Sequence, residues 1–180
     1  MTRTPDREAR FNSSPRPAHR GHRRTPRLER LEDRTLMAVL TVNTTSDNNV
    51  GGNALSLRAA ISLVNDPSLL SSSATQAEKA QVTGTLGVPG TPDVVHFAIP
   101  GSGVQTIAPA TPLPTIASPL IIDGYSQPGT RRYDPADGRD AVLLIQVNGF
   151  SLPPGAAGLD IRAGSSTVSG LVFHGFNGAP

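Results

Sequence analysis

The stretch of sequence that decides the fold is PLPTIASPLIIDGYSQPG, residues 112–129. Within it, the short apolar run from Pro119 to Ile122 is followed directly by Asp123 and Gly124. A continuous apolar run of this length, bounded by turn residues, indicates a buried strand. Asp favours a turn because its carboxylate can accept a hydrogen bond from the backbone two residues later. The stretch therefore predicts one strand and the corner that ends it.

Similar strand-and-corner units recur through the second half of the chain. We expect strands near residues 94–98, 104–107, 119–122, 142–147, 158–162 and 167–173, with Gly, Pro or Asp in every gap. Several are continuous apolar runs, as in parallel sheets that are buried on both faces. The main runs recur roughly every 20–25 residues, a period typical of solenoids. The pattern therefore predicts stacked turns of β-structure, interrupted by a polar loop at 127–140.

Upstream of these strands the hydrophobic pattern changes to the period of a helix. Residues 54–65, ALSLRAAISLVN, place four apolar side chains on one face. The face consists of Leu57, Ala60, Ile61 and Val64. Asn53 or Ser56 can cap the helix, and the Asn-Asp-Pro sequence from residue 65 stops it. A strand is expected from Met37, and a second short helix is expected around 74–82.

Composition limits the chemistry available to the chain. It has 180 residues, with Gly 18, Pro 17, aromatic residues at 4% and no Cys. The absence of Cys excludes disulfides, thiol catalysis and Cys-based zinc sites. Charge is split, because residues 1–34 hold ten Arg against five acids and residues 35–180 hold six basic residues against nine acids. This asymmetry indicates a tail with a function of its own.

We expect two parts, residues 1–36 and residues 37–180. Residues 1–27 have almost no apolar content and four prolines, so the basic tail is expected to be disordered. The apolar stretch from Leu36 to Leu40 is shorter than the ~7 residues of a secretory h-region or the ~20 of a membrane span. The sequence therefore predicts no transmembrane segment.

Two segments resemble known families. Residues 41–65, with the core Ser56-Leu57-Arg58-Ala59-Ala60-Ile61, resemble the CSLREA-type segment of bacterial surface proteins, and residues 93–129 and 156–176 are similar to the coils that follow it. RLERLEDRTLMAV, residues 27–39, resembles the N-terminal export tag common on planctomycete surface proteins.

The resemblance implies an architecture and a location. Proteins of this kind are exported and fold as right-handed parallel β-helices of the pectin-lyase-like type. We therefore expect an all-β protein, a right-handed parallel β-helix or solenoid with one N-terminal capping helix and a basic tail, found outside the cell or at its surface. Because such proteins continue for many more coils, the chain is also expected to be an N-terminal portion.

Several acidic residues could belong to a site, and each has a simpler interpretation. Asp123 follows a strand, where turn chemistry is favoured over calcium binding or catalysis. Asp160 and Arg162 share a strand face, and a surface pair of this kind needs no function. Lyase-type chemistry needs several converging acids. The strand acids Asp93, Asp123 and Asp160 are instead 30 and 37 residues apart.

The other candidates are equally unspecific. Asp134, Asp137 and Asp140 echo a calcium loop but lack its closing Glu. His96 lies in one predicted strand, His174 follows another, and the two form no i, i+4 pair. No Gly-x-Ser-x-Gly elbow is present. We therefore assign no catalytic, cofactor-binding or metal-ligating residues and expect no cofactor.

The sequence favours a non-catalytic surface protein that is structural, adhesive or polysaccharide-binding. Its expected partners are polysaccharides or other cell-surface components. The alternative is a polysaccharide lyase or glycoside hydrolase whose catalytic residues lie beyond residue 180. Binding of nucleic acid by the Arg-rich tail is not favoured, because the tail has neither interleaved aromatic residues nor a recognisable fold. The sequence leaves the oligomeric state open.

Overall fold

The computed structural model describes residues 36–178, which fall within one compact unit, 34–180. The expectations for residues 1–35 therefore lie outside the described part of the chain. The described strands are β1 (Val39–Val42), β2 (Val82–Thr83), β3 (Asp93–Phe97), β4 (Gln105–Ile107), β5 (Leu120–Asp123), β6 (Ile145–Asn148), β7 (Thr167–Ser169) and β8 (Leu171–His174). The helices are α1 (Leu57–Asn65), α2 (Leu69–Ser72), α3 (Gln76–Lys79) and the short 3-10 helix η1 (Gly124–Ser126).

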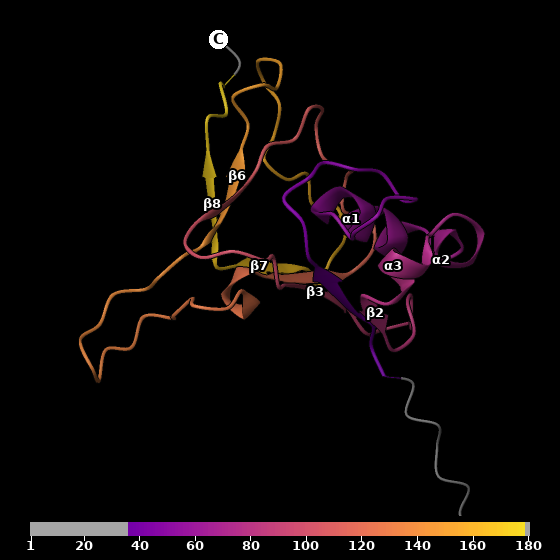
Figure 1. Cartoon of the computed structure of the whole chain (residues 1–180), viewed down its shortest axis with the longest axis horizontal. Helices are drawn as coiled ribbons and strands as arrows, with labels where there is room; N and C mark the ends of the chain where they lie inside the picture. Colours follow the sequence, from indigo (N-terminus) through magenta and orange to yellow (C-terminus); the bar gives the residue numbers. More distant parts are fainter. Residues whose placement is uncertain (1–35, 179–180) are drawn as a thin grey trace, which may run out of the picture. The chain divides into compact units, whose positions relative to one another are not determined.

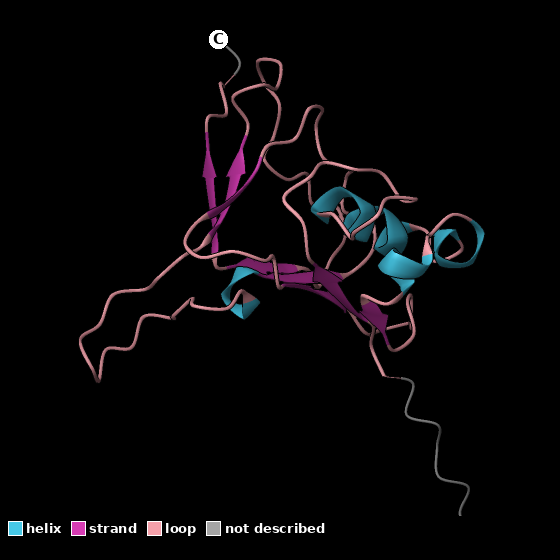
Figure 2. Cartoon of the chain, viewed as in Figure 1, coloured by secondary structure: helices cyan, strands magenta, loops and turns pink. Residues whose placement is uncertain are grey.

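The strands form two sheets that are mainly parallel. One has five strands in the order β2-β1-β3-β5-β7, and the other has three in the order β4-β6-β8. Only β1 and β2 pair antiparallel; the other neighbours are parallel. After β3, successive strands alternate between the two sheets, whose strands run in clearly different directions in Figure 1. Figure 2 shows α1, α2 and α3 gathered on one side of the first sheet, with η1 apart from them.

The expected all-β, right-handed parallel β-helix is wrong. The structure is a mixed α/β fold with two parallel-rich sheets, three α-helices and eight strands within residues 36–178. Residues 158–162 were expected to form a strand, yet they contribute only a bridge between Ile116 and Ile161. The helix expected to cap the sheets is α1, which lies in the core; α2 was not expected, and α3 falls within the second short helix expected around 74–82. An apolar run indicates only that its residues are buried. Burial alone does not determine whether successive strands stack as repeating coils.

Helix α1 is buried more completely than an amphipathic helix on a surface. Of the two predicted caps, Asn53 and Ser56, it is Ser56 that accepts a hydrogen bond from the backbone N–H of Ala59. Seven of its nine residues are buried. Its apolar side chains join those of β1, β3, β5 and β6 in one core cluster. The helix is therefore part of the core that positions both sheets.

The polar loop predicted at 127–140 projects from the strands. Residues 127–142, which we call the arm, fold back on themselves with bridges between Arg131 and Val142 and between Asp134 and Arg139. The arm extends well beyond the sheets in Figure 1, where it is drawn in orange. Its base is held by Gln127, whose side-chain amide accepts from the Ile99 N–H at 2.9 Å and donates to the Ile99 carbonyl at 2.9 Å. The arm is thus anchored at one end while most of it is exposed.

Candidate functional site

The strand register aligns four polar residues across the first sheet. Thr41, His96, Asp123 and Ser169 occupy equivalent positions on β1, β3, β5 and β7. Side chains alternate between the two faces of a strand. The preceding row, which includes Leu40, points into the core. The four residues therefore form a polar row on the outer face; we call it the outer row.

Asp123 lies between His96 and Ser169 in this row and makes several side-chain hydrogen bonds. Its Oδ1 accepts from the Ser169 hydroxyl at 3.2 Å and from the Tyr125 N–H at 3.1 Å. Arg132 donates from Nη2 to both carboxylate oxygens, at 2.9 and 3.0 Å. The bond to Tyr125 is the turn chemistry that the Asp-Gly corner predicts, since Asp123 caps η1. The bonds to Arg132 and Ser169 could not be predicted.

Arg132 comes from the arm and lies over the aromatic ring of Tyr125. Its Cζ is 4.2 Å from the ring centroid, a cation–π arrangement that fixes the guanidinium plane. The Arg132 side chain is nevertheless 60% exposed. Because a guanidinium carries five N–H donors and Asp123 uses only Nη2, donors remain for a ligand. The arrangement presents an oriented cation beside a row of hydroxyl, imidazole and carboxylate groups.

The outer face of the second sheet is also polar and uncharged at most positions. Thr106 is in register with Gln146, and Asn148 is in register with His174. The neighbours of Gln146 along β6 are fully buried, so Gln146 points outward. The two histidines considered as candidate site residues therefore belong to different sheets, His96 to the first and His174 to the second.

The three strand acids that the sequence singled out do not converge. Asp93 is buried, and its carboxylate accepts from the Ala38 and Gly87 N–H groups at 3.1 and 3.0 Å. It begins β3, whereas Asp123 ends β5. Asp160 lies on neither sheet. Each acid is engaged by its own local partners, and no pair is arranged to share a reacting group.

The pKa of Asp160 is lowered by its neighbours. Hydrogen bonding from Arg162 and then from the Thr115 hydroxyl, with the charge of Arg162, holds the pKa of Asp160 below its usual value of 3.8 against an opposing desolvation effect. The Arg162–Asp160 contact is 2.9 Å, and the Arg162 side chain is 75% exposed. A depressed pKa keeps this carboxyl ionised at neutral pH, so it cannot serve as a general acid there.

The three acids of the calcium-loop-like stretch, Asp134, Asp137 and Asp140, stabilise the local structure of the arm. Asp134 accepts from the Ala136 N–H, and Asp137 accepts from the Arg139 N–H, in turns where an Asp side chain binds the backbone two residues later. The backbone carbonyl of Asp140 accepts from Arg131. Within residues 36–178 no group of three His, Asp or Glu side chains is placed to hold a metal ion.

Sequence reasoning missed two buried charged groups. Arg58 binds Asp47 at 2.8 Å, with side chains only 9% and 12% exposed. Glu78 is fully buried and accepts from the N–H groups of Gly51, Gly52 and Thr75. Thr75 and Glu78 form a capping box, which the spacing Thr-x-x-Glu could have indicated. Both groups are satisfied by the protein and serve structure.

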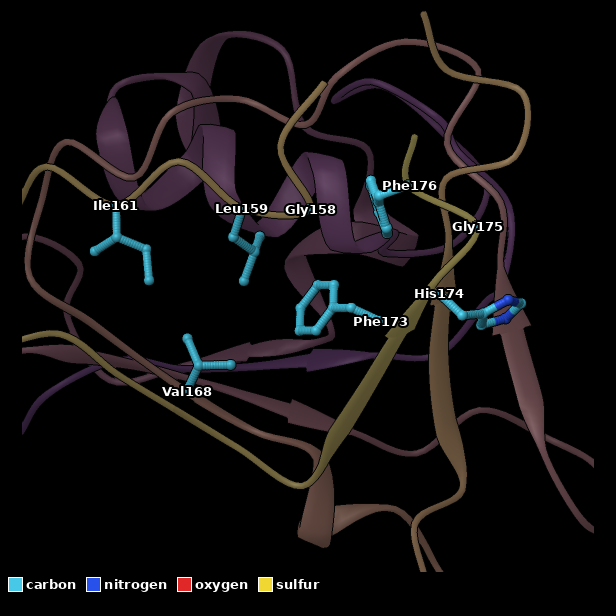
Figure 3. Close-up of a pocket in the computed structure, with 8 residues that line it drawn as sticks. All are labelled: Gly158, Leu159, Ile161, Val168, Phe173, His174, Gly175 and Phe176. Atoms are coloured by element: carbon cyan, nitrogen blue, oxygen red, sulfur yellow. The ribbon is translucent and has the colours of Figure 1, made fainter. Parts of the chain in front are cut away.

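An open apolar pocket of about 500 Å³ lies between the last strands of the two sheets. Figure 3 shows Phe173 and Val168 on β8 and β7 pointing toward Leu159, while His174 points away from them. The lining residues are Gly158, Leu159, Ile161, Val168, Phe173, His174, Gly175 and Phe176. The pocket brings together no charged side chains.

None of the helices in residues 36–178 has the length and apolar character needed to cross a membrane. Comparison of the chain with protein-family models, with curated proteins and with solved structures finds no match.

Proposed function

We propose that this protein is non-catalytic and that the outer row binds polysaccharide. The observation that carries the proposal is the register, which places hydroxyl, imidazole and carboxylate groups side by side on four adjacent strands. Adjacent strands are about 4.8 Å apart. The row is therefore a regular series of donors and acceptors suited to the hydroxyl groups of a chain of sugars.

Arg132 supports the same proposal because it extends the row with an oriented donor. The ring of Tyr125 and the carboxylate of Asp123 hold its guanidinium in one orientation, so less entropy is lost when it binds a ligand. The carboxylate of Asp123 offsets the positive charge of Arg132. The guanidinium is therefore suited to binding hydroxyl groups as well as carboxylates. The arm therefore contributes to the proposed binding surface.

A binding role is favoured over catalysis by the contacts of the candidate groups. Ser169 donates its hydroxyl to Asp123, whose carboxylate is already paired with Arg132, whereas an activated serine is bonded to a free base, most often a histidine. Glycoside hydrolysis requires a pair of carboxylates that flank the scissile bond. Asp93, Asp123 and Asp160 lie on separate elements, and each is bound to partners of its own. The proposed location, outside the cell or at its surface, rests on the resemblance of residues 27–39 to an export tag.

The test is affinity electrophoresis of the full chain in native gels that contain a neutral glucan or polygalacturonate. We expect migration to be slowed by at least one of these polysaccharides. Removal of one charge-assisted hydrogen bond, worth about 1.5–3 kcal/mol, should weaken binding about 10-fold or more in Arg132→Gln. Ser169→Ala should weaken it less, because a neutral hydrogen bond contributes less.

The matched control is Arg139→Gln, which removes another exposed arginine from the same arm. The Arg139 side chain is 68% exposed, and its contact with Asp137 is 3.7 Å long. Its binding should equal that of the unaltered protein. The proposal fails if neither polysaccharide slows the unaltered protein, or if Arg139→Gln weakens binding as much as Arg132→Gln.

A further inference from the structure

A second, smaller pocket lies where β3 and β5 begin. Its volume is about 150 Å³. Its walls come from the loop that precedes β3 and from the residues just before β5. The lining residues are Gly87, Val88, Pro89, Gly90, Thr91, Asp93, Ser118 and Pro119. We call it the β3 pocket; it shares no residue with the outer row or with the arm, so it is a separate candidate site.

Backbone hydrogen bonds hold the walls of the β3 pocket in place. The Thr91 N–H donates to the Val88 carbonyl at 3.1 Å, which closes a turn in the loop before β3. The Asp93 N–H donates to the Pro119 carbonyl at 3.2 Å, which joins this loop to the segment before β5. The main chain therefore fixes both segments that form the pocket.

Asp93 is a buried carboxylate in the wall of this pocket. It is 2% exposed and in register with Leu120 on β5. Because side chains alternate along a strand, Asp93 lies on the same face of β3 as Val95, which belongs to the core. Its carboxylate is held by the N–H groups of Ala38 and Gly87, at 3.1 and 3.0 Å. An acid thus stands at a position where the sheet otherwise carries apolar side chains.

The negative charge of Asp93 has no cationic partner within residues 36–178. Both of its hydrogen-bond donors are neutral backbone amides, and none of the ion pairs among these residues includes it. A buried charge is costly unless an opposite charge or a metal ion pairs with it. Each carboxylate oxygen accepts one of the two N–H groups, although a carboxylate can accept about four hydrogen bonds. Asp93 therefore has both the charge and the acceptor sites to bind a cation.

We infer that the β3 pocket binds a primary ammonium group at the end of a short alkyl chain, as in a free alkylamine or in a lysine side chain of another molecule. A primary ammonium has three N–H donors. The pocket offers them the carboxylate of Asp93 and the hydroxyl groups of Thr91 and Ser118. Val88 and Pro119 supply apolar walls for the methylene groups. Apolar walls with a few polar groups that fix orientation are the usual composition of a ligand site.

The size of the β3 pocket favours a slim alkyl chain over other cations. A cavity of about 150 Å³, the volume of this pocket, can hold a molecule as large as benzene. An amino sugar is larger than benzene, so its ring would remain outside. A calcium ion needs about 6–8 oxygen ligands, whereas Asp93 is the only carboxylate in the pocket. An alkylammonium satisfies the charge, the hydroxyl groups and the apolar walls together.

The first experiment is an NMR titration of the full 180-residue chain with n-butylammonium. We expect saturable binding with a dissociation constant in the millimolar range. Butyltrimethylammonium has the same charge but no N–H donors, so it should bind at least 10-fold more weakly. The uncharged 1-butanol should also bind at least 10-fold more weakly, because it cannot compensate the charge of Asp93.

A lysine derivative distinguishes the two sources of the ammonium group. Nα-acetyl-lysine N-methylamide carries the same butylammonium group on a peptide backbone. Binding as tight as that of n-butylammonium, or tighter, would identify a lysine of another molecule as the ligand. Binding at least 10-fold weaker would identify a free alkylamine, because the peptide backbone would then collide with the mouth of the pocket.

The second experiment repeats the n-butylammonium titration with three variants. Asp93→Asn removes the charge and should weaken binding at least 10-fold. Ser118→Leu should weaken it as much by narrowing the pocket, and Ser118 makes none of the hydrogen bonds of Asp93, so the test survives if Asp93→Asn does not fold. Asp137→Asn is the matched control, because it removes an acid of the arm whose side chain is 43% exposed; its binding should be unchanged. Far-UV circular dichroism checks that each variant is folded.

Three results would overturn the inference. The unaltered chain could show no saturable binding of n-butylammonium up to about 50 mM, a concentration well above a millimolar dissociation constant. Butyltrimethylammonium could bind as tightly, or Asp137→Asn could weaken binding as much as Asp93→Asn, either of which would show attraction to negative charge in general. Sodium chloride could displace the amine where choline chloride at the same concentration does not, which would make the pocket an alkali-cation site. None of these results depends on polysaccharide, so they are separable from the proposed function.

Discussion

Arg58 shows how much one buried side chain can organise in this protein. Its guanidinium binds both oxygens of Asp47 and donates to the carbonyls of Thr111 and Pro112, at 3.0 Å or less. Asp47 also accepts from the Ala110 N–H at 2.9 Å. A single ion pair thus ties α1 to two loops that are more than 50 residues apart in the sequence. Truncating one partner would leave a buried charge and several backbone groups unsatisfied.

We therefore predict that Arg58→Met lowers the free energy of unfolding by about 3–5 kcal/mol, the usual cost of removing one partner of a buried ion pair. Arg139→Met should cost no more than about 1 kcal/mol, because its pair is exposed. Urea denaturation followed by circular dichroism measures both. Equal losses in the two variants would contradict the role given to Arg58.

Asp160 makes a pH-dependent contribution whose sign follows from its depressed pKa. The pKa of Asp160 is lowered below 3.8 in the folded protein, mainly by hydrogen bonding from Arg162. The folded state therefore binds this proton less readily than the unfolded state. Ionised Asp160 stabilises the fold above pH 3.8, and this stabilisation is lost as pH falls through the folded-state pKa.

The corresponding variant is Asp160→Asn, which cannot titrate. We expect the unaltered protein to be more stable than the variant by a constant margin above about pH 5. The margin should shrink as the pH is lowered below 3.8. Urea denaturation at half-unit steps from pH 2 to 6 measures the difference. A margin that does not change with pH would show that the carboxylate charge contributes nothing.

At the scale of elements, a close contact between two corners fixes the last strands. Gly170 separates β7 from β8 and has a φ of +73°. A Cβ on Gly170 would lie 2.5 Å from the backbone nitrogen of Tyr125, and one on Gly124 would lie 2.2 Å from the Gly170 carbonyl oxygen. The expected single strand at 167–173 is consequently two strands in two sheets. Only glycine combines this backbone conformation with so close an approach.

We predict that Gly170→Ala destabilises the fold by at least about 3 kcal/mol, because left-handed strain adds to a backbone clash. Gly138→Ala is the matched control. Gly138 also has a positive φ, of +66°, but a Cβ there meets nothing within 4 Å. It should cost about 1–2 kcal/mol. Thermal melting of both variants gives the comparison, and similar losses would show that the corner contact is not constraining.

At the scale of the whole described unit, one core joins the helices to both sheets. Ile61 on α1, Ile122 on β5 and Ile145 on β6 all have an exposed fraction of 0% and belong to the same cluster. No separate core belongs to either sheet alone within residues 36–178. The two sheets and α1 should therefore unfold as one cooperative unit.

The test compares the same substitution at three places. Ile61→Ala, Ile122→Ala and Ile145→Ala should each cost about 2–5 kcal/mol and shift one common transition. Val104→Ala, at a position that is 49% exposed, should cost less than about 1 kcal/mol. Hydrogen exchange monitored separately on β5 and β6 would contradict the idea if Ile145→Ala released one sheet and left the other protected.

The sequence predicted individual elements better than their assembly. Ser56 as the cap of α1, its end at Asn65, and strands near 94–98, 104–107 and 119–122 are confirmed within one or two residues. These features depend on local periodicity and turn chemistry, which neighbouring residues specify. The helix α2 and the strand β2 were missed, because residues 66–83 carry no strong period.

The candidate site was the least predictable part. Asp123 could be recognised as a corner residue from the Asp-Gly sequence alone. Its alignment with His96 and Ser169 depends on strand register, and its pairing with Arg132 depends on how the arm folds back. No local rule links residues that are 27 or 46 positions apart in the sequence.

By itself, the sequence determined where strands, corners and the first helix form, because these are set by the period of apolar side chains and by Gly, Pro and Asp between them. The tertiary structure decided that the fold is mixed α/β and that the strands divide between two sheets. The physical reason is that an apolar residue specifies burial without specifying its neighbour, and only packing of the whole unit chooses which surfaces meet.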